Sequence, residues 1–147
     1  GREMQDELLK IQEKLQRTMV FITHDFLEAI KMGDHIAIMK DGEVSQVGTP
    51  EEIVANPKDQ YVKDFCEDVP KYKVLSAGKV MRKECCDETK NLFSKKTDCI
   101  MDNLKIETLI DKLVDTDKSY PVICNETGNL LGEIDRSIVM KSMKSKS

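Results

Sequence analysis

The sequence predicts an α/β fold in its first part and a smaller α+β unit, of order β-α-β-β-α, in its second part. Two observations support this. An apolar run rich in β-forming residues lies between two helical patterns near the N-terminus, and an amphipathic helical pattern alternates with short apolar strands further along. The length of 147 residues allows one ordinary domain or two very small ones.

The first part opens with a predicted helix over residues 3–17, whose one apolar face holds Met4, Leu8, Ile11 and Leu15. Residues 18–23 are apolar on both faces, which is typical of a strand buried on both sides, as in a parallel sheet. Asp25 can then cap a short helix that Gly33 ends.

A hairpin follows this short helix. Residues 35–40 and 43–47 have strand patterns, and Asp41-Gly42 between them suits a two-residue turn in which both central positions adopt positive φ. The hairpin therefore ends directly before the next helix start, at Thr49.

Two short helices complete the first part. Thr49 caps the first of them, with Glu52 three residues on to close a capping box, and Asn56-Pro57 ends it. Residues 59–67 form an amphipathic helix whose predicted inward side chains are Tyr61, Val62 and Phe65.

The second part follows a boundary near residues 68–77. Residues 78–96 are charged, contain the adjacent pair Cys85-Cys86 and show no clear periodic pattern. The elements predicted beyond them are a strand over 98–101, a helix over 106–113, strands over 120–124 and 130–134, and a last helix that Asp135 caps and that extends to Met143.

Composition excludes several classes of function. Acidic residues outnumber basic ones, giving a net charge of −4, and there is no Trp, so nothing indicates a nucleic-acid partner. Neither a bilayer-length apolar run nor a signal-peptide stretch is visible, and we expect an intracellular, soluble chain. The five cysteines contain no C-x-x-C pair, which favours reduced thiols and no structural metal.

His24 is the residue most suggestive of chemistry. It follows the carboxyl end of the predicted buried strand, where ligands of open α/β sheets gather. An imidazole there can hydrogen-bond a phosphate oxygen and help to align an attacking water. On spacing alone, however, a purely structural hydrogen bond is the stronger interpretation, and the adjacent Asp25 does not complete a hydrolytic triad.

The neighbouring sequence changes that balance. Residues 20–29 resemble the switch-histidine region of ABC-transporter ATPase subunits, residues 33–43 and 46–53 continue the match without a gap, and residues 3–9 look like the helix that follows the Walker B and D-loop segment. The resemblance covers about the first 67 residues. The most similar subfamily is the ATP-binding subunit of glycine betaine/proline (quaternary amine) importers, which carries CBS domains after its ATPase domain.

The second part resembles a reduced CBS region. Residues 77–82 look like the opening of a first CBS unit, and residues 97–143 resemble a second one. The resemblance implies three segments: 1–67 from the C-terminal end of an ABC ATPase domain, 68–96 as linker and remnant of a first CBS unit, and 97–147 as a CBS-like unit with a basic tail. Where nucleotide-binding CBS units carry a hydroxyl and an acid, this chain has Asp135 and Ile138, which argues against AMP or ATP there.

The resemblance implies a role in ATP-driven uptake of compatible solutes. His24 would contact the γ-phosphate in the closed ATPase dimer, with Asp25 in the same loop, and the intact subunit would use ATP and Mg. Its partners would be a transmembrane permease subunit and a second copy of itself, at the inner face of the cell membrane. The CBS region would regulate transport in osmoregulation, through ionic strength or a small regulatory ligand.

The chain lacks the Walker A, signature and Walker B motifs, and we expect it not to hydrolyse ATP by itself. Gly1 is not an initiator Met, so we expect a cut edge there. A strand buried on both faces would then lack cover in residues 3–67, which predicts self-association. The alternative function is a stand-alone CBS-type regulatory module that binds a ligand or only dimerises.

Overall fold

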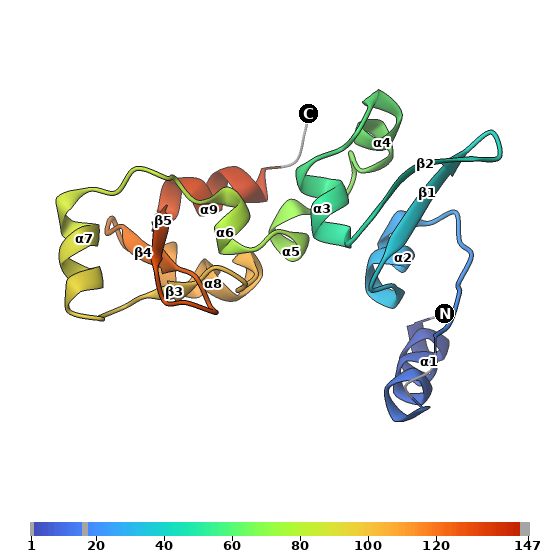
Figure 1. The fold of residues 1–147 in the computed structure, drawn as a ribbon, viewed down its shortest axis with the longest axis horizontal. Coiled ribbons are helices and arrows are strands. Elements are labelled where there is room, and N and C mark those ends of the chain that lie inside the picture. Colours follow the sequence, from blue (N-terminus) through green and yellow to red (C-terminus); the bar gives the residue numbers. More distant parts are fainter. Residues whose placement is uncertain (1, 16–17, 145–147) are drawn as a thin grey trace. The chain divides into compact units, whose positions relative to one another are not determined.

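The computed structural model describes residues 2–15 and 18–144 and divides the chain into two compact units, 1–69 and 70–147. Figure 1 shows that both units are built from helices and short strands. The boundary at Val69 and Pro70 lies within the stretch where the sequence pattern is interrupted.

The first unit contains one two-stranded antiparallel sheet and short helices. Its elements are α1 (Arg2–Leu15), α2 (Phe26–Met32), β1 (Ile36–Lys40), β2 (Glu43–Gly48), α3 (Pro50–Ala55) and α4 (Gln60–Phe65). The predicted hairpin is confirmed, with Asp41 at φ 52° and Gly42 at φ 80° in the turn. Strand β1 pairs with β2 from Ile36 opposite Gly48 to Lys40 opposite Glu43.

Helix α3 begins at the predicted capping box. The Thr49 hydroxyl accepts the Glu52 N–H at 3.2 Å, and the Glu52 carboxylate accepts the Thr49 N–H at 3.0 Å. Two backbone donors that a helix start leaves free are thus satisfied reciprocally. Asn56 is the C-cap, as the Asn-Pro pair predicts.

The core of the first unit lies between the hairpin and helices α2 to α4. Its fully buried members are Ile53 and Val62, and the Phe26 ring meets Phe65 edge-on at 5.4 Å. Of the three side chains predicted to face inward from α4, only Val62 is buried, whereas Tyr61 is half-buried and Phe65 is 36% exposed. Helix α4 is only six residues long, and Val62 is its one buried residue. The prediction that Tyr61 and Phe65 also face the core is therefore met only in part.

The predicted buried strand over residues 18–23 is wrong. No strand is assigned there, and Val20 and Ile22 are 88% and 93% exposed. Strands β1 and β2 pair with each other, and no described residue offers a third strand to this segment. Without a neighbouring strand, the backbone donors and acceptors of an apolar run have no ladder to join.

Helix α1 also buries no side chain of the described residues, although an ion pair joins its Asp6 to Lys31 of α2 at 3.0 Å. The predicted helix extends to residue 17, while α1 ends at Leu15, and residues 16–17 lie outside the described part. Of the side chains on its predicted apolar face, Met4, Ile11 and Leu15 are exposed at 66%, 48% and 54%, and Leu8 is half-buried.

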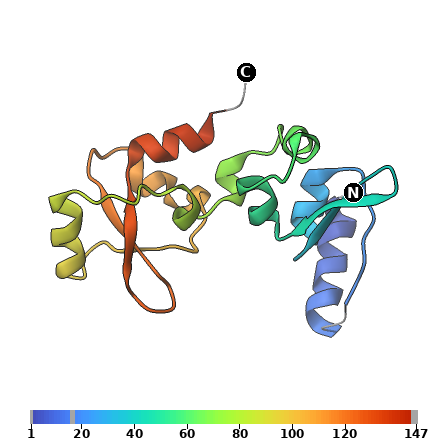
Figure 2. The same ribbon diagram turned by 45° about the horizontal axis from the view of Figure 1, so that its top comes forward.

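The second unit is a three-stranded sheet with helices on both sides (Figure 2). Its elements are α5 (Lys71–Val74), α6 (Ala77–Val80), α7 (Asp87–Ser94), β3 (Ile100–Met101), α8 (Ile106–Leu113), β4 (Tyr120–Ile123), β5 (Leu130–Ile134) and α9 (Arg136–Met143). Strand β4 is central, parallel to β3 and antiparallel to β5. The order β-α-β-β-α from β3 to α9 is as predicted.

The sheet is covered by α8 and α9 on one side and by α7 on the other (Figure 2). The fully buried side chains are mostly aliphatic and come from strands and helices alike: Ile106, Leu113, Val122, Ile134 and Val139. Helix α7 lies in residues 78–96, for which the sequence pattern predicted little structure, because its exposed face is charged and only Thr89 is buried.

Within residues 2–15 and 18–144, no helix is both long and apolar enough to cross a membrane. The five cysteines are free thiols, as the sequence predicts. Of the basic tail, Lys141 and Lys144 are exposed, and Lys146 lies outside the described residues.

Candidate functional site

The structure places His24 and Asp25 together in the loop before α2. His24 is exposed. The Asp25 carboxylate accepts the N–H groups of Leu27 at 3.0 Å and Glu28 at 3.4 Å, which makes it the N-cap of α2. The Asp25 N–H in turn donates to the Thr23 hydroxyl at 3.0 Å. Asp25 therefore fixes the loop, and the adjacent imidazole is free to meet a ligand from outside.

The described residues fit a triphosphate only in part. The His24 loop offers one exposed imidazole. No strand is assigned among residues 2–15 and 18–23, so the predicted sheet edge before His24 is not formed by the described residues. Within the described ranges, no group of three or more His, Cys, Asp or Glu side chains is placed to hold a metal ion. Among the described residues, the His24 loop therefore presents one exposed imidazole and no group of metal-ligating side chains.

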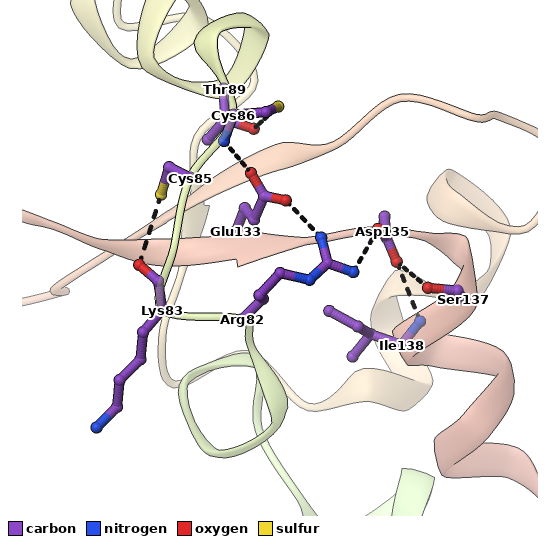
Figure 3. A network of polar contacts seen from close by, with 9 residues as sticks. All are labelled: Arg82, Lys83, Cys85, Cys86, Thr89, Glu133, Asp135, Ser137 and Ile138. Carbon is purple, nitrogen blue, oxygen red and sulfur yellow. Dashed lines mark hydrogen bonds and ion pairs between the residues drawn. The ribbon is translucent and has the colours of Figure 1, made fainter.

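A second cluster of polar residues lies in the second unit, around Arg82 (Figure 3). The guanidinium pairs with the Glu133 carboxylate through Nη1 and with Asp135 at 3.0 Å through Nη2. Glu133 is only 3% exposed, and its other oxygen accepts the Cys86 N–H at 2.8 Å. The buried carboxylate is therefore satisfied by one cation and one backbone donor from the same segment.

The backbone supports this cluster. The Arg82 N–H donates to the Glu133 carbonyl at 2.9 Å, and the Glu133 N–H donates to the Arg82 carbonyl at 2.8 Å, so segment 82–86 lies along β5 at this point. A Cβ on Gly132 would come within 2.4 Å of the Arg82 carbonyl oxygen. Only glycine permits this close approach of the two backbones.

The cluster changes the acidity of its carboxylates. Burial pushes the pKa of Glu133 upward, but hydrogen bonds from the Cys86 N–H, Thr89 and Arg82 outweigh it, and the pKa lies below its ordinary value. Burial also raises the pKa of Asp135, but hydrogen bonds from Ser137, the Ile138 N–H and Arg82 lower it by more, so this pKa too lies below its ordinary value. Both acids are therefore ionised at neutral pH.

Asp135 has two roles in this arrangement. It accepts the Ile138 N–H at 3.1 Å as the predicted N-cap of α9, and it pairs with Arg82. Its carboxylate, which the sequence suggests would repel a phosphate, is thus already engaged by a helix start and a cation.

Sequence reasoning did not predict the link between Arg82 and Glu133. One signal was present: Glu133 is an acid inside the apolar strand run 130–134, and such a position requires a partner when it faces the core. The partner is 51 residues away along the chain, and no local pattern connects the two.

Comparison with known proteins finds relatives that match both units, and these relatives are named as ATP-binding proteins of transport systems. The Trimethylamine N-oxide transport system ATP-binding protein of Pelagibacter ubique is 43% identical over 145 residues, 99% of this chain and 40% of that protein. The Glycine betaine/proline betaine transport system ATP-binding protein of Escherichia coli is 41% identical over 132 residues, 90% of this chain and 31% of the relative.

The Glycine betaine/carnitine transport ATP-binding protein of Listeria monocytogenes is 54% identical over 80 residues, covering 54% of this chain and 20% of that protein. No family model matches the chain. The chain spans about two fifths or less of the length of these relatives.

These identities place the chain among the ATP-binding subunits of ABC transporters. It matches the C-terminal region of subunits that are named for the transport of glycine betaine, proline betaine, choline and trimethylamine N-oxide.

We predict that Arg82→Met destabilises the second unit by about 1–3 kcal/mol, because it leaves the Glu133 carboxylate buried without its cation. Urea unfolding followed through the amide signals of residues 70–144 measures this loss. Arg136→Met is the matched control, since Arg136 pairs at 2.8 Å with Asp117, whose side chain is 89% exposed, and such a pair contributes about 0–1 kcal/mol. Equal effects of the two substitutions would contradict the prediction.

The same cluster predicts acid sensitivity. Since the pKa values of Glu133 and Asp135 lie below their ordinary values of 4.5 and 3.8, their contribution to stability is complete above those values. It is lost as the pH falls through the lowered pKa values. The free energy of unfolding of Glu133→Gln should therefore fall less steeply below the ordinary value of 4.5 than that of the unaltered chain. Asp117→Asn is the control, and an identical slope for Glu133→Gln and the unaltered chain would refute the assignment.

Proposed function

We propose that the chain is part of the ATPase subunit of an ABC importer for compatible solutes of the quaternary amine type. The observation that supports this most directly is 43% identity over 99% of the chain to a subunit named for trimethylamine N-oxide transport. The relatives named for glycine betaine and proline betaine extend the solute class to small, methylated, zwitterionic compounds.

His24 is the residue through which this chain takes part in ATP hydrolysis. Its imidazole is exposed at the start of α2, and Asp25 holds the loop by capping that helix. In the complete subunit this imidazole donates a hydrogen bond to the γ-phosphate oxygen and helps to align the attacking water. Mg and the phosphate-cradling groups would come from residues outside this chain.

The proposed setting is the inner face of the cell membrane, where the subunit binds a transmembrane permease. In this proposal, residues 1–67 come from the C-terminal end of the ATPase domain, residues 68–96 are a linker with the remnant of a first CBS unit, and residues 97–147 form a CBS-like regulatory unit with a basic tail. The ion pairs of Arg82 with Glu133 and Asp135 join the second and third of these segments. The CBS-like unit adjusts transport to ionic strength or to a small ligand. The alternative, a stand-alone regulatory or dimerisation module, is less well supported, since the relatives are transport ATP-binding proteins.

The test uses the complete subunit that contains this chain, reconstituted with its permease in vesicles. We predict that His24→Ala lowers both ATP hydrolysis and glycine betaine uptake by roughly a hundredfold or more, the range of a lost acid–base or oxyanion contact. His35→Ala, the other exposed histidine, is the control and should retain activity.

The 147-residue chain alone should release no phosphate above the level of its own His24→Ala variant, with or without Mg. Mg-dependent turnover by the chain alone, or full activity of the complete subunit with His24→Ala, would overturn the proposed role.

We also propose that the chain self-associates through the exposed apolar run of the first unit. Val20 and Ile22 are 88% and 93% exposed, and a run of this kind favours covering its apolar surface with a second copy. Light scattering at micromolar concentration should give a dimer, and Val20→Ser with Ile22→Ser should shift it toward monomer. Leu104→Ser, which removes a 41% exposed side chain elsewhere, is the control. A clean monomer of the unaltered chain would contradict this proposal.

A further inference from the structure

A hollow of about 360 Å³ lies in the second unit between the segment before α7 and the start of β5. It is lined by Lys83, Glu84, Cys85, Lys90, Leu130 and Leu131. Its volume falls at the lower end of the range of small-molecule sites, roughly 300–1,000 Å³. We propose that this hollow binds a small organic anion with a short apolar body, such as a medium-length carboxylate.

The hollow is distinct from the Asp135 end of the Arg82 cluster. Leu130 is the first residue of β5, whereas Asp135 follows the end of that strand and caps α9. A ligand in the hollow would therefore meet neither the helix cap nor the Asp135 carboxylate. It would also involve no residue of the His24 loop, so its test is independent of the ATPase proposal.

Charge at the rim favours an anion. Two lysines, Lys83 and Lys90, face one carboxylate, Glu84, and both lysines are exposed. Figure 3 shows the Lys83 side chain running away from the Arg82 cluster, with no marked interaction at its ammonium group. Two ammonium groups that line one hollow can both attract the same carboxylate.

Cys85 does not oppose an anion. Burial, and next the charge of Glu133, raise the pKa of its thiol above the ordinary value, so the side chain is neutral at pH 7. The Glu133 carboxylate itself is occupied by Arg82 and the Cys86 N–H on the other side of this segment. Glu84 is therefore the one carboxylate among the lining residues.

Two of the residues that line the hollow, Leu130 and Leu131, are apolar. Leu130 is half-buried, and Leu131 is 36% exposed at the surface. An alkyl chain lying on these two side chains would remove apolar surface of both partners from water. A ligand with a charge but no apolar body would lose this contribution.

The backbone of the segment that carries Lys83, Glu84 and Cys85 is held in place before a ligand arrives. Segment 82–86 is held at one end by the paired backbone hydrogen bonds of Arg82 and Glu133, and at the other by the Cys86 N–H on the Glu133 carboxylate at 2.8 Å. Lys90 is carried by α7, whose first turn follows at once. A preformed wall lowers the ordering cost of binding, which favours a specific site over a transient surface contact.

The experiment titrates the isotope-labelled 147-residue chain with sodium hexanoate and follows its backbone amide signals. Hexylammonium has the same apolar body with the opposite charge, and acetate has the charge with almost no body. We expect saturable shifts at residues 83–85 and 130–131 with hexanoate, and no saturable shift with either control probe.

Two double variants test the lysines. Lys83→Gln with Lys90→Gln should weaken hexanoate binding roughly tenfold, in keeping with two exposed charge contacts. Lys118→Gln with Lys141→Gln removes two exposed lysines outside the lining and should leave the affinity within about twofold.

Equal affinity in the two double variants, shifts centred elsewhere, absence of saturation, or binding of hexylammonium as strong as that of hexanoate would each overturn the proposal. Unchanged amide signals outside the hollow show that the variants are folded. On the unaltered chain, hexylammonium tests whether binding needs the negative charge, and acetate tests whether it needs the apolar body.

Discussion

The second unit depends on a buried carboxylate that is joined to a distant cation. Glu133 faces the interior from β5 at 3% exposure, and Arg82 reaches it from a segment 51 residues earlier. Were the pair not formed, burying this charge would be strongly unfavourable. The ion pair, the Cys86 N–H and the paired backbone bonds together fix segment 82–86 against the sheet. Gly132 makes this approach sterically feasible, because a side chain there would meet the Arg82 carbonyl.

This constraint connects fold and proposed function. The same segment that satisfies Glu133 also forms one wall of the hollow between Lys83 and Leu131. Lys83 and Cys85, which line the hollow, lie within three residues of Arg82 along the chain.

The first unit illustrates the opposite situation. Its hairpin and capped helices form a small core around Ile53 and Val62, yet residues 18–23 find no strand partner among the described residues. The apolar character of Val20 and Ile22 is that of a sheet interior, while their exposure is that of a surface loop. The chain spans 40% or less of the relatives described above, and in the proposed complete subunit other residues would cover this run. The His24 loop directly follows this run.

The sequence by itself determined the local features. The Asp41-Gly42 turn, the Thr49 capping box, the Asp25 and Asp135 caps and the β-α-β-β-α order all follow from nearest-neighbour chemistry, which acts over about four residues. Tertiary structure alone decided whether the apolar run 18–23 has a partner strand, that Arg82 meets Glu133, and that α7 forms in a stretch with no clear pattern. These features depend on contacts between residues far apart in the chain, and local sequence patterns do not predict such contacts.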